Sequence, residues 1–249
     1  MSVKIDCVFI HGWAMNSAVW QQCLQQLPPW INPICVDLPG YGEFAGATAN
    51  TLDAYVEHVA RRIPRPALMV GWSLGGLVSL RLARCYPQKV SALFQVATSP
   101  KFVQAADWQC AIEAGLFDQF AQALQQDINR TIRRFLALQV RGTPTSMQTV
   151  RQLQAAIDER GLPAMAALLV GLKLLAQTDL RTELNELDCP VTWLLGDKDA
   201  LVPFELALTL AQLPINADIQ KLSGAGHAPM VSHPGEFLTS LLRTADGLR

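Results

Sequence analysis

Ser73 is the residue whose surroundings most clearly indicate chemistry. It is the centre of Gly-Trp-Ser-Leu-Gly, residues 71–75, which follows the apolar run Ala67–Val70 and precedes a stretch with helical spacing. A serine on so tight a turn from strand to helix presents its hydroxyl beyond the sheet edge, in the arrangement called a nucleophile elbow. The pentapeptide alone would be weak evidence, because glycine and serine are common residues. Its strand–turn–helix context predicts a nucleophile.

A serine nucleophile needs a base, and His227 is the best placed of the four histidines. It lies in a loop of small residues that follows the strand-like run Ala217–Leu222. Such a loop lets an imidazole reach over the edge of a sheet. The other three histidines have structural interpretations: His11 directly follows the first predicted strand, His58 fits a helix face, and His233 precedes the last predicted helix.

The acid that orients this histidine has two candidates, Asp197 and Asp199. Both follow the predicted buried strand Val191–Leu195. We favour Asp199, because it lies further into the loop, whereas Asp197 fits a residue that caps a turn. The chain order serine, aspartate, histidine is the order of α/β-hydrolases.

The oxyanion of a tetrahedral intermediate requires two backbone N–H donors. One is expected from Leu74, the residue after the nucleophile, and the other from the loop that follows an earlier strand. Residues 7–10 are that strand and His-Gly-Trp, residues 11–13, opens the loop. The sequence therefore predicts an oxyanion hole made by Trp13 and Leu74.

The elements that must position these residues form an alternating pattern. Strands are predicted at 4–10, 33–37, 67–70, 90–96, 191–195 and 217–222, and helices at 17–27, 51–63, 76–86, 204–213 and 234–245. This alternation predicts the α/β class, with a mostly parallel sheet covered by helices on both faces. The strand signal disappears between residues 98 and 182, where several helices with polar breaks are expected. We therefore predict an α/β-hydrolase core at 1–97 and 183–249 and an inserted helical lid at 98–182.

Composition restricts the class of protein. Half of the 249 residues are hydrophobic, and the net charge of −1 argues against a general nucleic-acid binder. The six cysteines show no metal-ligand spacing, which predicts reduced thiols and no metal. No apolar run is long enough for a signal peptide or a membrane span. We expect a cytoplasmic monomer that binds neither nucleic acid nor membranes.

The predicted lid has two unusual properties. Residues 128–157 hold five arginines and no acidic residue, the arginines being Arg130, Arg133, Arg134, Arg141 and Arg151. This cluster is either a solvated helix face or a docking surface for an acidic partner. The runs 135–138 and 162–175 are more apolar than surface helices require. They either pack on the sheet or form a slot for an acyl chain.

Six runs in the sequence carry a family resemblance: residues 71–78, 11–13, 36–42, 134–139, 227–229 and 232–234. Together they resemble the pimeloyl-[acyl-carrier protein] methyl ester esterases of bacterial biotin synthesis. The resemblance covers nearly the whole chain and includes the lid, where Phe-Leu-Ala-Leu-Gln at 135–139 is the discriminating run. It implies substrate contacts from Trp13, Ser73, Leu74, Phe135, Leu136, Ala137, Leu138, Gln139 and His227. It also implies that Arg130, Arg134 and Arg151 bind the acidic carrier protein, while a fourth arginine of the family falls near Met147.

The resemblance implies a serine carboxylesterase that needs no cofactor and removes the methyl group from carrier-bound pimeloyl methyl ester. Ser73 would be acylated, with His227 as base and Asp199 as its orienting acid. Three other interpretations remain: a broad carboxylesterase or thioesterase acting on small esters, a lyase or C–C hydrolase with the same triad, and a non-catalytic receptor. A complete triad argues against the receptor.

Overall fold

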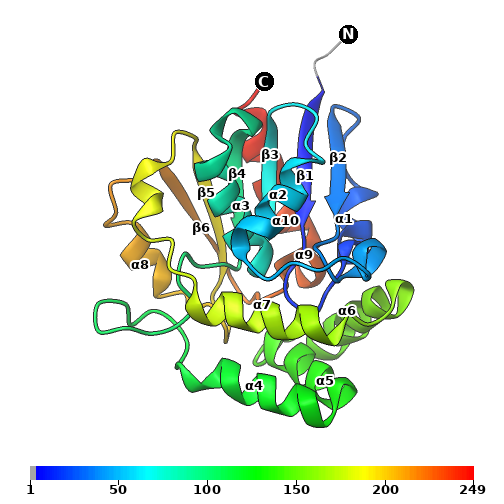
Figure 1. The fold of residues 1–249 in the computed structure, drawn as a ribbon. Coiled ribbons are helices and arrows are strands. Elements are labelled where there is room, and N and C mark those ends of the chain that lie inside the picture. Colours follow the sequence, from blue (N-terminus) through cyan, green and yellow to red (C-terminus); the bar gives the residue numbers. More distant parts are fainter. Residues whose placement is uncertain (1–3) are drawn as a thin grey trace.

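The computed structural model describes residues 4–249, which contain one six-stranded sheet with the order β2-β1-β3-β4-β5-β6 (Figure 1). All five strand pairs are parallel. The strands are β1 (Ile5–Ile10), β2 (Ile31–Val36), β3 (Ala67–Trp72), β4 (Val90–Val96), β5 (Val191–Gly196) and β6 (Ala217–Leu222). Every residue of β3 and β5 is buried, as in parallel sheets covered on both faces.

Helices cover both faces of this sheet, as predicted. Successive side chains of a strand point to opposite faces. On β4, Gln95 donates a hydrogen bond to Ser79 of α3 (2.8 Å), whereas the neighbouring Phe94 packs against Phe237 of α10 (5.8 Å between ring centroids). The helices associated with the sheet are α1 (Gln21–Leu24), α2 (Leu52–Ala60), α3 (Leu74–Cys85), α8 (Leu206–Leu210), α9 (Pro229–Ser232) and α10 (Pro234–Asp246).

The first predicted helix is shorter than expected. Residues 17–27 form a 3-10 turn, Ser17–Trp20, followed by the single α-helical turn of α1. The Asn16 side chain caps the 3-10 turn by accepting a hydrogen bond from the Ala18 N–H (3.0 Å). Pro28 and Pro29 follow soon after and disfavour further helix. The other 3-10 segments are Gly42–Phe44, Pro87–Lys89 and Glu183–Glu186.

Four helices lie between β4 and β5: α4 (Gly115–Gln126), α5 (Ile128–Gln139), α6 (Ser146–Arg160) and α7 (Met165–Gln177). Figure 1 shows them together beyond the carboxyl ends of the strands, at the lower end of the view. The predicted polar breaks near 141–145 and 160–163 separate α5 from α6 and α6 from α7. We call residues 98–182 the insert.

The prediction that the insert is helical throughout is wrong for its first part. Residues 101–112 form a loop with isolated β-bridges between Val103 and Ile112 and between Ala105 and Trp108. The Trp108 indole donates a hydrogen bond to the Lys101 carbonyl (2.9 Å) and so closes the loop. Bridges of one residue pair leave no periodic pattern in the sequence, which explains why the sequence shows no strand signal there.

The insert is attached to the sheet mainly through α6 and α7. The Trp13 indole donates to the Leu168 carbonyl (2.8 Å), and the Asn16 amide donates to the Ala156 carbonyl (2.9 Å). Arg160, at the end of α6, bridges to the buried Asp37 (3.3 Å). These contacts hold α6 and α7 against the loops that follow β1 and β2. None of the helices in residues 4–249 combines the length and the hydropathy that crossing a bilayer would require.

Candidate active site

Ser73 occupies the sharp turn between β3 and α3 with a strained backbone. Its φ of +53° and ψ of −116° lie in a region that residues with a Cβ rarely adopt. Three hydrogen bonds hold it there: the Ser73 N–H donates to the Val96 carbonyl (3.1 Å), and the Ser73 carbonyl accepts from the Gly76 N–H (2.8 Å) and the Thr98 hydroxyl (2.7 Å). The turn also needs Gly75, because a Cβ there would collide with the Ile10 carbonyl oxygen. The sequence therefore folds into the predicted elbow.

The structure brings Ser73, His227 and Asp199 into one chain of hydrogen bonds. The Ser73 hydroxyl lies 2.9 Å from Nε2 of His227, and Nδ1 of His227 lies 2.8 Å from Oδ2 of Asp199. All three residues are buried. A carboxylate can only accept hydrogen bonds, so the Nδ1 atom carries the proton and Nε2 is left to accept the serine proton. This tautomer is the one that a general base requires.

Asp199 is itself fixed by the turn that follows β5. Its other oxygen, Oδ1, accepts hydrogen bonds from the N–H groups of Leu201 (2.8 Å) and Val202 (3.0 Å). Asp197 points elsewhere and accepts from the Gly224 N–H (2.7 Å). That hydrogen bond lowers the pKa of Asp197, and the nearby Lys221 contributes. Asp199, rather than Asp197, is therefore the aspartate in contact with His227.

The other histidines have structural surroundings. His11 donates from Nδ1 to the Gly12 carbonyl (2.8 Å) and accepts at Nε2 from the Leu38 N–H (3.0 Å). Burial lowers its pKa, so the ring is neutral in both hydrogen bonds. His58 bonds the Asp37 carbonyl (3.0 Å). His233 is the N-cap residue of α10.

Sequence reasoning gave no role to two residues that hold the elbow and the base. The Trp72 indole donates to the His227 carbonyl (2.7 Å), and Thr98 bonds the Ser73 carbonyl. The first contact joins residues 155 positions apart in the chain and the second joins residues 25 apart. No local pattern reports such long-range pairs, and only the position of Trp72 within the elbow motif gave a hint.

Trp13 and Leu74 lie at the carboxyl ends of β1 and β3. These strands flank the point where the strand order reverses, the usual position of a ligand site in open α/β sheets. A Cβ added at Gly12 would lie 3.3 Å from the Ser73 Cβ, so the loop after β1 adjoins the elbow. Leu74 is the first residue of α3, where backbone N–H groups have no helical partner.

The insert builds an aromatic wall over this edge of the sheet. The Trp13 ring meets Phe135 of α5 edge-on (4.6 Å between centroids) and Phe120 of α4 at 6.2 Å. Gly171 lets α7 approach, because a Cβ there would lie 2.6 Å from Cδ1 of Trp13. The His227 N–H donates to the carbonyl of Gln139, the last residue of α5 (2.9 Å). The insert thus contacts the base directly.

The predicted substrate run on α5 is divided between two faces of the helix. Phe135, Leu136 and Gln139 are buried on the inner face, whereas Ala137 is exposed and Leu138 is half-buried. Helical periodicity places residue i+4 on the same side as residue i and residue i+2 on the opposite side, which is the position of Ala137 relative to Phe135. The structure therefore does not bring Ala137 to the catalytic serine.

All five arginines of residues 128–157 are exposed, and none forms an ion pair with any residue of the described chain. Eight of the nine other arginines do form ion pairs: Arg61, Arg65, Arg81, Arg84, Arg160, Arg181, Arg243 and Arg249. The arginines predicted to dock the carrier, Arg130, Arg134 and Arg151, therefore lie on an unneutralised surface. Residues 4–249 contain no group of three or more histidine, cysteine or acidic side chains that could hold a metal ion.

Comparisons with known proteins identify the family of this chain. A model of the Alpha/beta hydrolase family matches residues 7–240. A protein of Photobacterium profundum is 40% identical over 236 residues, covering 95% of this chain and 92% of the relative. One of Vibrio vulnificus is 39% identical over 240 residues, covering 96% and 94%. Both are named pimeloyl-[acyl-carrier protein] methyl ester esterase.

Solved structures extend the likeness to the fold. An esterase from Exiguobacterium antarcticum superposes with a TM-score of 0.85 at 18% identity, covering 99% of this chain and 93% of that one. A bromoperoxidase from Bacillus anthracis gives a TM-score of 0.86 at 19% identity, covering 98% and 93%. The predicted α/β-hydrolase fold and the family resemblance are both confirmed. The chain belongs to the α/β-hydrolase family and, within it, to the pimeloyl-[acyl-carrier protein] methyl ester esterases.

Proposed function

We propose that this protein hydrolyses the methyl ester of pimeloyl-[acyl-carrier protein], giving methanol and carrier-bound pimelate with a free carboxylate, the step that the family resemblance assigns to biotin synthesis. The observation that carries the proposal is the hydrogen-bonded chain Ser73–His227–Asp199 in a protein about 40% identical to esterases of that name. A triad of this kind transfers acyl groups from esters without a cofactor.

Acylation follows from the geometry. Oγ of Ser73 attacks the ester carbonyl carbon while Nε2 of His227 takes the serine proton, and Asp199 stabilises the imidazolium. The negative charge that develops on the carbonyl oxygen is held by the N–H groups of Trp13 and Leu74. One such donor is worth roughly 100- to 1,000-fold in kcat. The bond from the acyl carbon to the methoxy oxygen then breaks, and His227 returns the proton to the leaving methanol.

Deacylation repeats these steps with water. His227 accepts a proton from the water that attacks the acyl carbon, and the proton then passes to Oγ of Ser73 as the ester bond to the serine breaks. The atoms balance: one ester and one water give one carboxylic acid and one methanol. The acid ionises at neutral pH, with its proton released to solvent.

The apolar wall of the site fits the methylated substrate better than the product. Trp13 and Phe135 pack together over the elbow, and Leu136 and Gln139 lie beside them on the inner face of α5. A methyl ester is uncharged and enters such a site easily, whereas a carboxylate loses its hydration there. The same wall therefore favours the ester and promotes release of the acid.

The unpaired arginines supply the contact with the carrier. An acidic carrier brings carboxylates, and arginine guanidinium groups pair with these. Arg130 and Arg134 lie on α5 and Arg151 on α6, so carrier binding would position the acyl arm beside the insert. This contact distinguishes the proposed enzyme from a broad esterase acting on small esters.

The test is turnover by the purified protein of pimeloyl-carrier methyl ester compared with a short free methyl ester. We expect kcat/KM to be much higher for the carrier-bound ester, with methanol and pimeloyl-carrier as products and no turnover by Ser73→Ala. Equal kcat/KM for both esters would instead indicate a broad carboxylesterase. Turnover that persists in Ser73→Ala would remove the proposed mechanism.

A further inference from the structure

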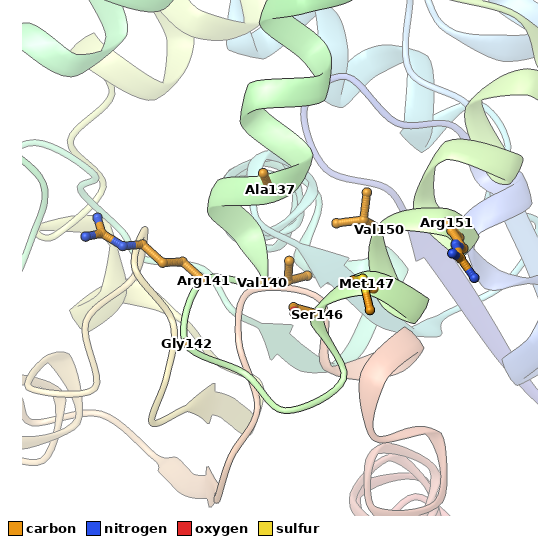
Figure 2. Close-up of a pocket in the computed structure, with 8 residues that line it drawn as sticks. All are labelled: Ala137, Val140, Arg141, Gly142, Ser146, Met147, Val150 and Arg151. Atoms are coloured by element: carbon orange, nitrogen blue, oxygen red, sulfur yellow. The ribbon is translucent and has the colours of Figure 1, made fainter.

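An open cleft of about 510 Å³ lies on the outer side of the insert, between the end of α5 and the start of α6 (Figure 2). Its apolar surface comes from Ala137 and Val140 on one side and from Met147 and Val150 on the other. Arg141 and Arg151 stand at opposite sides of the cleft. None of the three triad residues lines it, so this cleft is a surface feature separate from the catalytic serine.

The centre of the cleft exposes more apolar surface than folding alone explains. The Met147 side chain is 75% exposed, although helix α6 has an inner face that carries Leu153 and Ile157. A single exposed apolar residue needs no explanation. Met147 instead lies beside the partly exposed Val150, and the exposed Ala137 also lines the cleft, so the three side chains form one apolar patch. Methionine at such a patch adapts to the shape of a partner.

The charge around the cleft has a single sign. Arg141 and Arg151 are exposed and have no acidic partner among the described residues, and residues 128–157 contain no acid at all. An apolar centre surrounded by charged groups is the composition of a specific protein interface. A second copy of this chain is a poor occupant, because a twofold contact would bring these arginines against one another. An acidic partner fits.

We propose that this cleft is the apolar centre of the carrier-protein interface and takes an apolar side chain that is flanked by carboxylates on the carrier. The flanking carboxylates pair with Arg141 and Arg151, and Met147 and Val150 supply the buried contact. The inference rests on the proposed function and adds to it the residues that provide specific contact in addition to charge. The docking surface therefore also includes Arg141, which contributes a charge, and Met147, which contributes an apolar contact.

The cleft is also close to the chemistry. In the sequence, Gln139 lies between two cleft residues, Ala137 and Val140. Its carbonyl accepts a hydrogen bond from the His227 N–H. A carrier held in the cleft therefore contacts the same end of α5 that positions the base.

The test uses Met147→Gln, which keeps the length of the side chain and removes its apolar character. Met147 is exposed, so the substitution leaves folding unaffected. The matched control is Leu208→Gln, because Leu208 is 70% exposed on α8, a helix that Figure 1 shows well away from α5 and α6. For the carrier-bound ester we expect Met147→Gln to lower kcat/KM about five- to thirty-fold, mainly through KM. Arg141→Ala should act in the same direction, with the short free ester and the control unaffected.

Other outcomes separate this inference from the proposed function. If Met147→Gln behaves like Leu208→Gln while loss of Arg130 and Arg134, which do not line the cleft, lowers carrier turnover, the cleft lies outside the interface and the inference fails alone. Equal losses on both esters would place the effect at the active site and also overturn it. If Met147→Gln dissociates a dimer in sedimentation without changing carrier turnover, a second copy occupies the cleft and the inference is wrong. A wild-type enzyme with no preference for the carrier-bound ester would overturn both proposals.

Discussion

Ser73 combines a strained backbone with a buried hydroxyl, so its side chain contributes to chemistry more than to stability. Ser73→Ala removes only the oxygen that contacts His227 (2.9 Å) and keeps the backbone bonds to Val96 and Gly76. We expect the ester-hydrolysis rate to fall by several orders of magnitude, with the melting temperature unchanged within a few degrees. Steady-state kinetics and thermal unfolding measure the two effects. A residual rate within tenfold of wild type would exclude Ser73 as the nucleophile.

The two aspartates after β5 provide a matched pair. The Asp199 carboxylate, beside Nδ1 of His227, can only accept a hydrogen bond, whereas the amide in Asp199→Asn can also donate one. The substitution therefore favours the wrong tautomer of His227 and should lower kcat about 10,000-fold. Asp197→Asn changes a residue bonded to the Gly224 N–H, away from His227, and should change kcat less than about threefold. Kinetics of both variants on one ester measure the ranking. The reverse ranking would assign the acid to Asp197.

Gln139 carries an unusual stability cost. Its side chain is fully buried, yet neither its amide nitrogen nor its amide oxygen has a hydrogen-bond partner within the described structure. A buried polar group without a partner costs about 1–3 kcal/mol. Gln139→Met should therefore raise the free energy of unfolding by about 1–2 kcal/mol. It should also lower kcat/KM for the carrier-bound ester, because we expect the unpaired amide to contact the substrate.

Denaturant unfolding and kinetics together test this trade-off. Gln139→Glu, with similar volume and one charge, is the control and should lower both quantities. A Gln139→Met variant that keeps full activity would show that the amide has no role toward substrate.

At the scale of elements, α5 and α6 carry the surface expected to bind the carrier. Each exposed ion pair contributes about 0.2–1 kcal/mol, so replacing Arg130, Arg134 and Arg151 together with alanine should cost roughly 1–3 kcal/mol, or about five- to a hundred-fold in kcat/KM for the carrier-bound ester. Raised salt should reproduce the loss in the wild type. Hydrolysis of a short free ester should hardly change, and the ratio of the two activities is the measurement.

The matched control for this variant removes three exposed arginines elsewhere, Arg61, Arg243 and Arg249, which changes the net charge equally. It should leave both activities near wild type. Equal losses on both esters in the α5–α6 variant would mean that these arginines hold the insert together. No loss on either ester would make them a solvated face.

The strands were the most predictable elements, because each is a short apolar run bounded by turn residues. β4 and β6 begin and end at the predicted residues, 90–96 and 217–222. The β-bridged loop at 101–112 was not predictable, since one-residue bridges depend on tertiary contacts. The buried face of α5 was also not predictable. The helical period groups Phe135 with Gln139, but only packing against Trp13 decides that this side faces inward.

In the candidate site, too, local sequence predicts some features, whereas others depend on contacts between distant segments. Ser73 was predictable from a local motif, and His227 and Asp199 from small-residue loops after buried strands. The hydrogen bonds from Trp72 and to Gln139 join segments far apart in the chain, so no local pattern encodes them.

At the scale of the whole molecule, the buried His11 and the half-buried His58 make stability depend on pH. Burial lowers the pKa of His11 and of His58 below the ordinary 6.5. The unfolded chain therefore binds more protons than the folded protein below about pH 6.5, and the free energy of unfolding falls as pH decreases through that range. Each histidine contributes a slope of up to about 1.4 kcal/mol per pH unit.

Urea unfolding between about pH 7.5 and pH 5 measures this slope. His11→Gln retains a donor and an acceptor and should flatten the slope, whereas His233→Gln, at the cap of α10, is the control and should leave it unchanged. An unchanged slope in His11→Gln would show that His11 is not the source.

The hydrogen bond from the His227 N–H to the Gln139 carbonyl restricts how this hydrolase can be recombined with others. A Cβ at Gly226 would lie 2.5 Å from the Gln139 carbonyl oxygen and 3.0 Å from a methyl carbon of Thr143. In a chimaera that exchanges residues 98–182, the new insert must therefore fit closely against the loop that carries Gly226 and His227, however well its helices pack elsewhere. The insert and the histidine loop should therefore be exchanged together, because a transplant that carries only the insert changes the position of the base as well as the specificity.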